Sequence, residues 1–107
     1  ITFIADIVEV SSADALKKLC FDLKHHINDH VAVLCANIGG KAHVAVSVSD
    51  TVVAAKNIDA AKIIKETVSP LIGGGGGGQK TLATAGGTEP GGFKELIEKI
   101  RMQLNTL

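Results

Sequence analysis

The sequence predicts an α/β domain, a small two-layer or three-layer sandwich with a mixed sheet of about four to five strands and three helices. Three observations lead to this fold class. Several short segments have apolar residues at every second position or in unbroken runs, which is typical of strands. Others repeat apolar residues at steps of three and four, as amphipathic helices do. With 107 residues, 46% of them hydrophobic, the chain is long enough for one domain with a buried core.

The N-terminal part predicts a strand followed by a helix. Residues 2–10 are rich in β-branched side chains and alternate in polarity, so we expect a strand with one fully apolar face. Ser11 and Asp14 then approximate a helix-start box, with the acidic residue near the positive end of the helix dipole. We expect this helix to end near Asn28. Its buried stripe consists of Ala13, Leu16, Cys20, Leu23 and Ile27.

The next two segments predict a β-hairpin. Residues 31–38 form a continuous apolar run, which favours a strand covered on both faces. Residues 37–40 have the composition of a tight turn. Residues 41–48 alternate between an apolar face and a second face. The first consists of Ala42, Val44, Val46 and Val48, and the second of Lys41, His43, Ala45 and Ser47. Asp50 and Thr51 are then expected to begin a turn.

The C-terminal part predicts two helices separated by a glycine loop and a strand. Asn57 can cap the first of these helices. Its buried stripe consists of Ala61, Ile64, Val68 and Leu71. Gly73 is the expected terminator of this helix. Residues 80–85, after the glycine run, have the length of a strand. The last helix is expected from about Phe93, with an inward stripe of Phe93, Leu96, Ile97, Ile100 and Leu104.

Composition narrows the classes of function. Eleven basic and eleven acidic side chains leave no net charge, so nucleic-acid binding would need a local basic patch or backbone contacts. Two cysteines, Cys20 and Cys35, are too few for a disulfide framework. We interpret both as small hydrophobic core residues. Neither a signal peptide nor a membrane-spanning segment is apparent, so we expect a reduced, cytoplasmic setting. Because the chain begins at Ile1 within a strand pattern, we also expect a fragment of a longer protein.

His26 and His30 form an H-x-x-x-H pair, a spacing that suits zinc on one helical face. A zinc site usually has four ligands, and no second pair accompanies these two histidines. We therefore expect no metal and interpret His26 and His30, together with His25, as polar-face or capping residues at a helix C-terminus. His43, on a polar strand face, is expected to be solvated.

Aromatic residues are scarce. The chain has three phenylalanines and neither Trp nor Tyr, which leaves few platforms on which bases could stack. Phe3 and Phe93 lie on apolar stripes, and Phe21 is a further core candidate. If the domain binds RNA, it should therefore recognise folded shape and backbone.

Residues 73–78 are six consecutive glycines, half of the twelve in the chain. Such a run is costly to order, because glycine loses more conformational freedom on folding than any other residue. Residues 74–81 come within one residue of the phosphate-binding pattern G-x-x-x-x-G-K-[ST]. However, Gln79 replaces the last glycine, and the expected order of helix, loop and strand is the reverse of a P-loop. We therefore do not expect nucleotide hydrolysis.

Two interpretations of the glycine run remain, a flexible linker and a contact surface. Well-patterned elements on both sides of the run favour a contact surface, as does the second glycine pair that closes the next strand. Without Cβ atoms, main-chain amides can approach phosphate or sugar directly, and Lys80 could add a phosphate contact. The predicted nucleic-acid-binding residues are Gly74, Gly75, Gly76, Gly77, Gly78, Gln79, Lys80, Gly86 and Gly87. We find no catalytic arrangement in the chain.

Residues 73–87, GGGGGGQKTLATAGG, resemble the signature of the C-terminal, DHH-associated domain of alanyl-tRNA synthetases, which reads like G-G-G-G-R-P-D-x-A-x-A-G-G. The matching positions are Gly75, Gly76, Gly77, Gly78, Ala83, Ala85, Gly86 and Gly87. Residues 56–66 resemble the helix that leads into this signature, and residues 44–48 resemble the strand before that helix. Gln79, Lys80 and Thr81 replace the usual Arg-Pro-Asp, so the contacts of these three side chains can differ from those of the family.

The resemblance implies that the parent protein is an alanine–tRNA ligase of the cytoplasm. ATP and magnesium, and zinc in an editing domain, would then be bound by parts of the parent outside this chain. Residues 1–107 would be a single non-catalytic domain that binds the outer corner of tRNA and so supports alanylation and editing elsewhere in the parent. The implied partners are tRNA and the other domains of the parent, with no membrane. Whether a second copy forms a homodimer stays open.

Two other classes of function stay open. The first is the substrate-binding domain of a DHH-family phosphoesterase that acts on nucleic acid or nucleotides. In that branch the signature resembles Gly-Gly-His, and its histidine binds phosphate. Gln79 stands at that position here and cannot supply an imidazolium. The second is a pure interaction or dimerisation module, which would bind no RNA.

Overall fold

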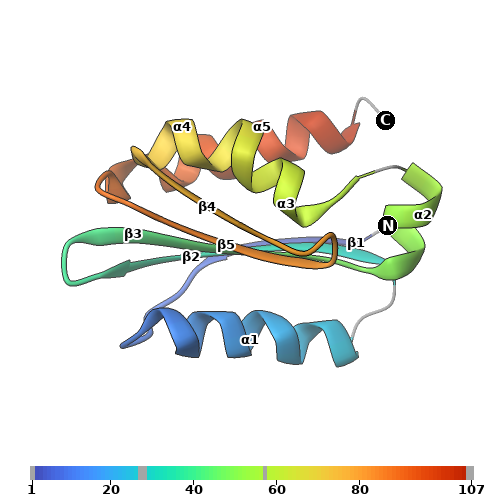
Figure 1. Ribbon diagram of the computed structural model, residues 1–107, viewed down its shortest axis with the longest axis horizontal. Coiled ribbons are helices and arrows are strands. Elements are labelled where there is room, and N and C mark those ends of the chain that lie inside the picture. Colours follow the sequence, from blue (N-terminus) through green and yellow to red (C-terminus); the bar gives the residue numbers. More distant parts are fainter. Residues whose placement is uncertain (1, 27–28, 57, 106–107) are drawn as a thin grey trace.

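The computed structural model describes residues 2–26, 29–56 and 58–105 (Figure 1). Five strands form one mixed sheet in the order β1-β2-β3-β5-β4. Their bounds are β1 Thr2–Ile7, β2 His30–Ile38, β3 Lys41–Val48, β4 Gly74–Gly78 and β5 Leu82–Gly87. β1 runs parallel to β2, and the other neighbouring strands are antiparallel. β4 is therefore the edge strand at one side of the sheet.

Helices cover both faces of the sheet, which makes three layers (Figure 1). α1 (Ala13–His26) lies on one face. The helical segment of residues 60–72 and α5 (Phe93–Asn105) lie on the other, and a 3-10 turn, Pro90–Gly92, leads into α5. The short helix α2 (Asp50–Lys56) follows the end of β3. The predicted α/β sandwich with a mixed sheet is confirmed, in its three-layer form.

The core has two parts, because successive side chains of a strand point to opposite faces of the sheet. The larger part lies under α5 and residues 60–72, and includes Val31, Val33, Cys35, Val44, Val46, Val48, Ile64, Val68, Ile72, Leu96 and Ile100. The smaller part lies under α1 and consists of Leu16, Cys20, Leu34, Ala36 and Ala45. Residues 31–36 are at most 2% exposed. The prediction of a strand covered on both faces is confirmed for β2.

The helical segment before the glycine run is irregular. It consists of α3, Ala60–Ile63, a π-helical turn, Ile64–Val68, and α4, Ser69–Ile72. Pro70 explains the irregularity, because proline has no N–H and its ring crowds the carbonyl one turn earlier. Directly before it, the N–H and the hydroxyl of Ser69 both donate to the Ile64 carbonyl, the hydroxyl at 2.9 Å. Gly73, with φ 65°, ends the segment as predicted.

Three segments differ from the sequence-based expectations. The glycine loop is a strand, since Gly74–Gly78 pairs with β5 along its whole length. The next strand is Leu82–Gly87, so its two glycines belong to the ladder and do not break it. Asp50 and Thr51 begin a seven-residue helix, α2, and not a turn. Asp50 lies in the first turn of that helix, where the dipole favours a negative charge.

The predicted boundary residues Asn28 and Asn57 and the predicted stripe residue Ile27 lie outside the described residues, as does the side chain of Leu104. α1 is described up to His26. Asp59 caps α3, because its carboxylate accepts a hydrogen bond from the N–H of Lys62 at 2.6 Å. None of the helices in the described ranges is long and apolar enough to span a membrane.

Two of the three phenylalanines belong to the larger core part, as predicted. Phe93 is buried, and Phe3 packs against the same cluster from β1. Phe21 was expected in the core but is 45% exposed on α1, where its ring meets the His25 ring edge-on at 4.8 Å. The first strand is shorter than the predicted range of residues 2–10, because β1 ends at Ile7. Its apolar face is only partly buried, since Ile7 is 47% exposed.

Candidate nucleic-acid interface

The glycines of β4 alternate between two environments. Gly74, Gly76 and Gly78 form the first set. A Cβ added at any of them would lie closer than 3.0 Å to main-chain atoms of β5, for example 2.6 Å from the Leu82 carbonyl oxygen in the case of Gly78. β4 therefore approaches β5 more closely than side chains would permit. The fold itself requires glycine at these three positions.

Gly75 and Gly77 form the second set. A Cβ added at either would have no heavy atom within 4 Å. Neither residue has a positive φ. Packing and backbone conformation therefore give no reason for glycine at these two positions. What distinguishes them is that they present bare main chain to an open space.

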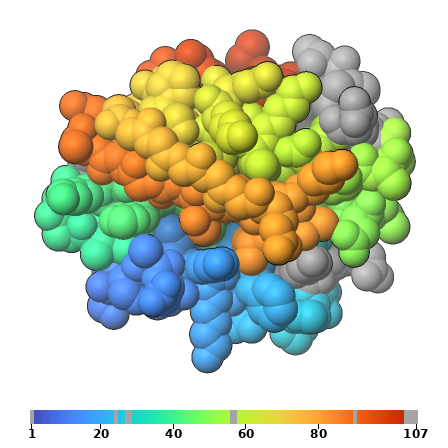
Figure 2. Space-filling model, in the orientation of Figure 1, coloured from blue at the N-terminus to red at the C-terminus, as the bar shows by residue number. Residues whose placement is uncertain are grey.

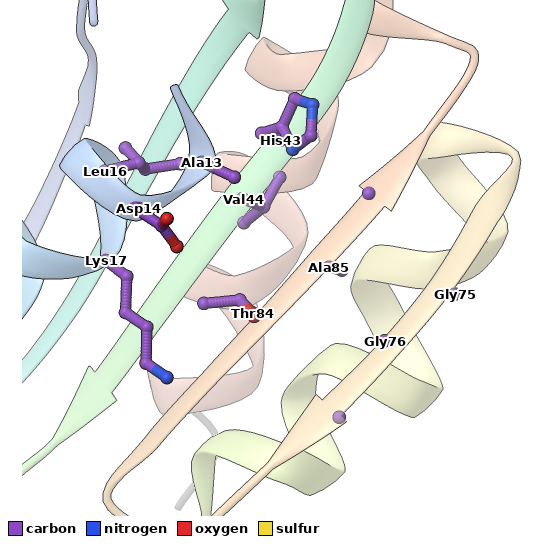
Figure 3. A pocket seen from close by; sticks show the side chains of 12 residues that line it. Ala13, Asp14, Leu16, Lys17, His43, Val44, Gly75, Gly76, Thr84 and Ala85 are labelled. Carbon is purple, nitrogen blue, oxygen red and sulfur yellow. The ribbon is translucent and has the colours of Figure 1, made fainter. Parts of the chain in front are cut away.

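The open space is a groove of about 400 Å³ between α1 and β4 (Figure 3). One wall is β4, through Gly75, Gly76 and Gly77. The other is the first part of α1, where Asp14 and Lys17 point into the groove. The floor is formed by β3 and β5, through His43, Val44, Thr84, Ala85 and Gly86. We call this feature, with the extension described next, the glycine groove.

The glycine groove continues along β4 toward the β4–β5 turn. A second hollow of about 300 Å³ is lined by Lys17, Gly77, Gly78, Gln79, Leu82, Ala83 and Thr84. Lys17, Gly77 and Thr84 border both parts, which makes them one surface. The groove exists because α1 packs against β2 and β3 and leaves the outer strands open on this face. In Figure 2 these strands, in orange, cross the front of the molecule above the blue helix α1.

The turn between β4 and β5 is held by main-chain hydrogen bonds on two sides. The Thr81 carbonyl accepts from the N–H of Val48 at 3.0 Å, which ties the turn to the end of β3. The Lys80 carbonyl accepts from the N–H of Ala60 at 2.7 Å, which ties it to the start of α3. The side chains of Gln79 and Lys80 are exposed. The turn therefore presents two polar side chains on a fixed main chain.

The structure brings only some of the predicted site residues together. Gly75, Gly76, Gly77, Gly78, Gln79 and Gly86 lie along the glycine groove. Lys80 lies on the other side of the turn, beside α3. Gly74 and Gly87 have a packing role, since a Cβ on Gly87 would collide with the carbonyl of Ile72.

Sequence reasoning missed four polar residues of the glycine groove, namely Asp14, Lys17, His43 and Thr84. Lys17 lies on the polar side of α1, and local periodicity does not reveal which distant strand that side will meet. His43 was expected to be solvated, but it is half-buried at the groove floor. Thr84 lies in the middle of the family-like signature, at a position where that signature specifies no residue. Only the strand order, with β5 between β3 and β4, brings these residues together.

The histidine pair of the sequence is divided between two elements. His26 is exposed at the end of α1, whereas His30 is the first residue of β2 and is fully buried. Nε2 of His30 lies 3.1 Å from Oγ of Ser47, and its main-chain N–H donates to Oγ of Ser49 at 3.0 Å. The interpretation of His30 as a polar-face or capping residue is therefore wrong. Within the described residues, no cluster of three or more His, Cys, Asp or Glu could hold a metal ion.

Both cysteines are free and buried, and they belong to different parts of the core. Burial raises the pKa of the Cys20 thiol and of the Cys35 thiol from 9.0 to about 12, because the interior disfavours the thiolate. Both thiols are therefore protonated and unreactive at neutral pH. Their prediction as core residues is confirmed.

These features define a class, a small α/β domain in which a glycine edge strand and a helix enclose an open groove. The chain belongs to the DHHA1 domain family, whose profile matches residues 1–106. The resemblance found in the sequence is thereby confirmed.

Relatives and a solved structure agree with this assignment. The chain is 43% identical over 88 residues to the alanine–tRNA ligase of Cytophaga hutchinsonii, and this alignment covers 82% of this chain and 10% of that protein. It is 36% identical over 104 residues to the ligase of Lactobacillus gasseri, and this alignment covers 97% of this chain and 12% of that protein. The chain thus spans about a tenth of the length of the curated relatives it matches. The C-Ala domain of Aquifex aeolicus alanyl-tRNA synthetase superimposes with a TM-score of 0.84 at 25% identity, covering 94% of this chain and 87% of that one.

Proposed function

We propose that this chain is the C-terminal domain of an alanine–tRNA ligase, and that its glycine groove holds the sugar–phosphate backbone of tRNA at the outer corner. The names of the relatives and the likeness to the C-Ala domain support the parent enzyme. The domain itself is non-catalytic. Alanine activation with ATP and magnesium, and editing with zinc, belong to other domains of the parent, which lies in the cytoplasm. Tethering tRNA here raises its effective concentration at those distant sites.

One observation carries the proposal, namely the bare main chain at Gly75 and Gly77. Both glycines border the glycine groove although packing does not require them. The backbone of a folded RNA is bulky, so a wall without side chains lets ribose and phosphate approach main-chain groups closely. Lys17 adds a positive charge at the middle of the groove, and Thr84 adds a hydroxyl, whereas Asp14 adds a negative charge at the α1 wall.

The composition of the domain suits recognition of folded RNA by shape. Because the chain has no net charge, affinity must come from local contacts and not from a long-range field. The two core phenylalanines cannot stack on bases, and the exposed Phe21 ring already contacts His25. Main-chain, hydroxyl and lysine contacts to ribose and phosphate recognise the shape of a folded RNA and not its base sequence.

A titration of the domain with alanine tRNA, followed by electrophoretic mobility, tests the proposal. The double substitution Gly75→Val and Gly77→Val fills the groove wall, and we expect it to weaken binding at least about tenfold, which corresponds to about 1.4 kcal/mol. Gly91→Val is the matched control, because a Cβ at Gly91 also has no heavy atom within 4 Å and this residue lies outside the groove. Unchanged affinity in the folded double variant would refute the proposal.

The same titration distinguishes the other classes of function. Tight binding of a mononucleotide in place of tRNA would favour the substrate domain of a phosphoesterase. Indifference to both ligands, together with a stable dimer in sedimentation, would favour an interaction module. A homodimer that still binds tRNA would leave the proposal intact and add a second copy to the partners, beside the other domains of the parent.

A further inference from the structure

A further hollow, of about 510 Å³, lies on the other side of the β4–β5 turn. Three lysines from three different segments line it: Lys62 from α3, Lys65 from the π-helical turn and Lys80 from the β4–β5 turn. The remaining lining residues are Asp59, Ala61, Glu66, Gly78 and Gln79. We call this feature the lysine hollow.

The three ammonium groups are available to a ligand. Lys62, Lys65 and Lys80 are exposed, and the two ion pairs found among the described residues both lie within α5. Of the two carboxylates in the lining, that of Asp59 already accepts the N–H of Lys62 as a helix cap. A chain that is neutral as a whole thus has a local excess of positive charge beside the glycine run.

The lysine hollow adjoins the glycine groove. Gly78 and Gln79 border both, so no other residue separates the two surfaces at this point. The turn between them is fixed, since the Lys80 carbonyl is bonded to the N–H of Ala60 at 2.7 Å. A ligand that leaves the groove past Gln79 therefore reaches the lysines directly.

We infer that the RNA backbone continues from the glycine groove around Gln79 into the lysine hollow, where Lys62, Lys65 and Lys80 contact consecutive phosphates. This inference rests on the proposed function. The ammonium group of lysine binds phosphate as a point charge and does not need the planar geometry of arginine. The ligand is a polynucleotide and not a single nucleotide, because one phosphate group cannot occupy both sides of the turn at once. The lysines replace part of the positive charge that this chain lacks at Gln79, where the family signature has an arginine.

The salt dependence of tRNA binding tests the inference. Each lysine that neutralises a phosphate contributes a slope of about −0.7 to −0.9 to the plot of log K against log salt concentration. The triple substitution Lys62→Gln, Lys65→Gln and Lys80→Gln should therefore lower the magnitude of the slope by about 2 to 3. Lys94→Gln is the control, because Lys94 is exposed on α5 and outside the hollow. A wild-type slope in the triple variant would overturn the inference.

A second variant should strengthen binding. Asparagine caps helices about as well as aspartate, so Asp59→Asn keeps the cap of α3 while it removes a negative charge from the lysine hollow. We expect tRNA to bind about two- to fivefold more tightly, in proportion to the loss of up to about 1 kcal/mol of repulsion. Unchanged or weaker binding, with an unchanged melting temperature, would count against the inference.

The two proposals can fail separately in this experiment. If Gly75→Val and Gly77→Val abolish binding while the triple lysine variant keeps the wild-type slope, the groove binds tRNA and the lysine hollow does not. If the wild-type domain does not bind tRNA at any salt concentration, the proposed function is wrong, and the continuation into the hollow is wrong with it.

Discussion

Alanine substitutions at neighbouring positions of β4 should change stability in opposite directions. At Gly75 and Gly77, an added Cβ meets no heavy atom within 4 Å. Replacing glycine by alanine at such a position stabilises a protein by about 0.4–1 kcal/mol, because the unfolded chain loses conformational freedom. At Gly76 the new Cβ would lie closer than 3.0 Å to the Thr84 carbonyl and the Ala85 Cα. Overpacking of this kind costs about 1–3 kcal/mol.

Urea denaturation and thermal melting of Gly75→Ala, Gly77→Ala and Gly76→Ala would measure this difference. We expect Gly75→Ala and Gly76→Ala to differ by about 1.5–4 kcal/mol in the free energy of unfolding. Since about 1 kcal/mol shifts the melting temperature of a domain of this size by about 4–8 °C, the melting curves should be clearly separated. Equal stability of the two variants, or a loss of more than about 1 kcal/mol in Gly75→Ala, would refute the division of β4 into structural and open glycines.

Three further predictions follow from the buried groups. The thiol pKa is 9.0 in the unfolded chain, whereas the pKa of Cys20 and of Cys35 is about 12 in the folded protein. The two buried thiols therefore contribute fully to the free energy of unfolding below pH 9.0, and this contribution falls as the pH rises toward 12. Urea midpoints at pH 8 and pH 10 should show this fall, and a double alanine variant should show less of it. Ser47→Ala removes a partner of buried His30 and should cost about 1–3 kcal/mol in urea unfolding; an unchanged midpoint would contradict this. Gly87→Ala places a methyl group against a carbonyl of α4 and should lower the melting temperature; tolerance of the methyl would show that β5 can move.

The sequence predicts the hairpin and the main helices well, because side-chain periodicity depends directly on burial. The alternation along residues 41–48 assigns the two faces of β3 correctly, since a strand repeats every two residues. The unbroken apolar run of residues 31–36 likewise identifies the strand that is covered on both sides. For these elements the local pattern contains the necessary information.

β4 and the glycine groove could not be predicted in the same way. Six glycines carry no side-chain pattern, so the pairing of β4 depends entirely on how closely β5 can approach it. The groove needs α1 and β4, which are far apart in the sequence and meet only because of the strand order. His30 was misassigned because it belongs to β2 and not to α1, so it does not share a helical face with His26.

The double attachment of the β4–β5 turn affects what kind of ligand could bridge its two sides. Since the carbonyls of Lys80 and Thr81 are bonded to a helix on one side and to the sheet on the other, this corner cannot open like a hinge without breaking both bonds. A molecule that touches both sides must itself follow the bend. Curvature of the ligand would thus act as a selection criterion, which a bent RNA fulfils and a straight duplex does not.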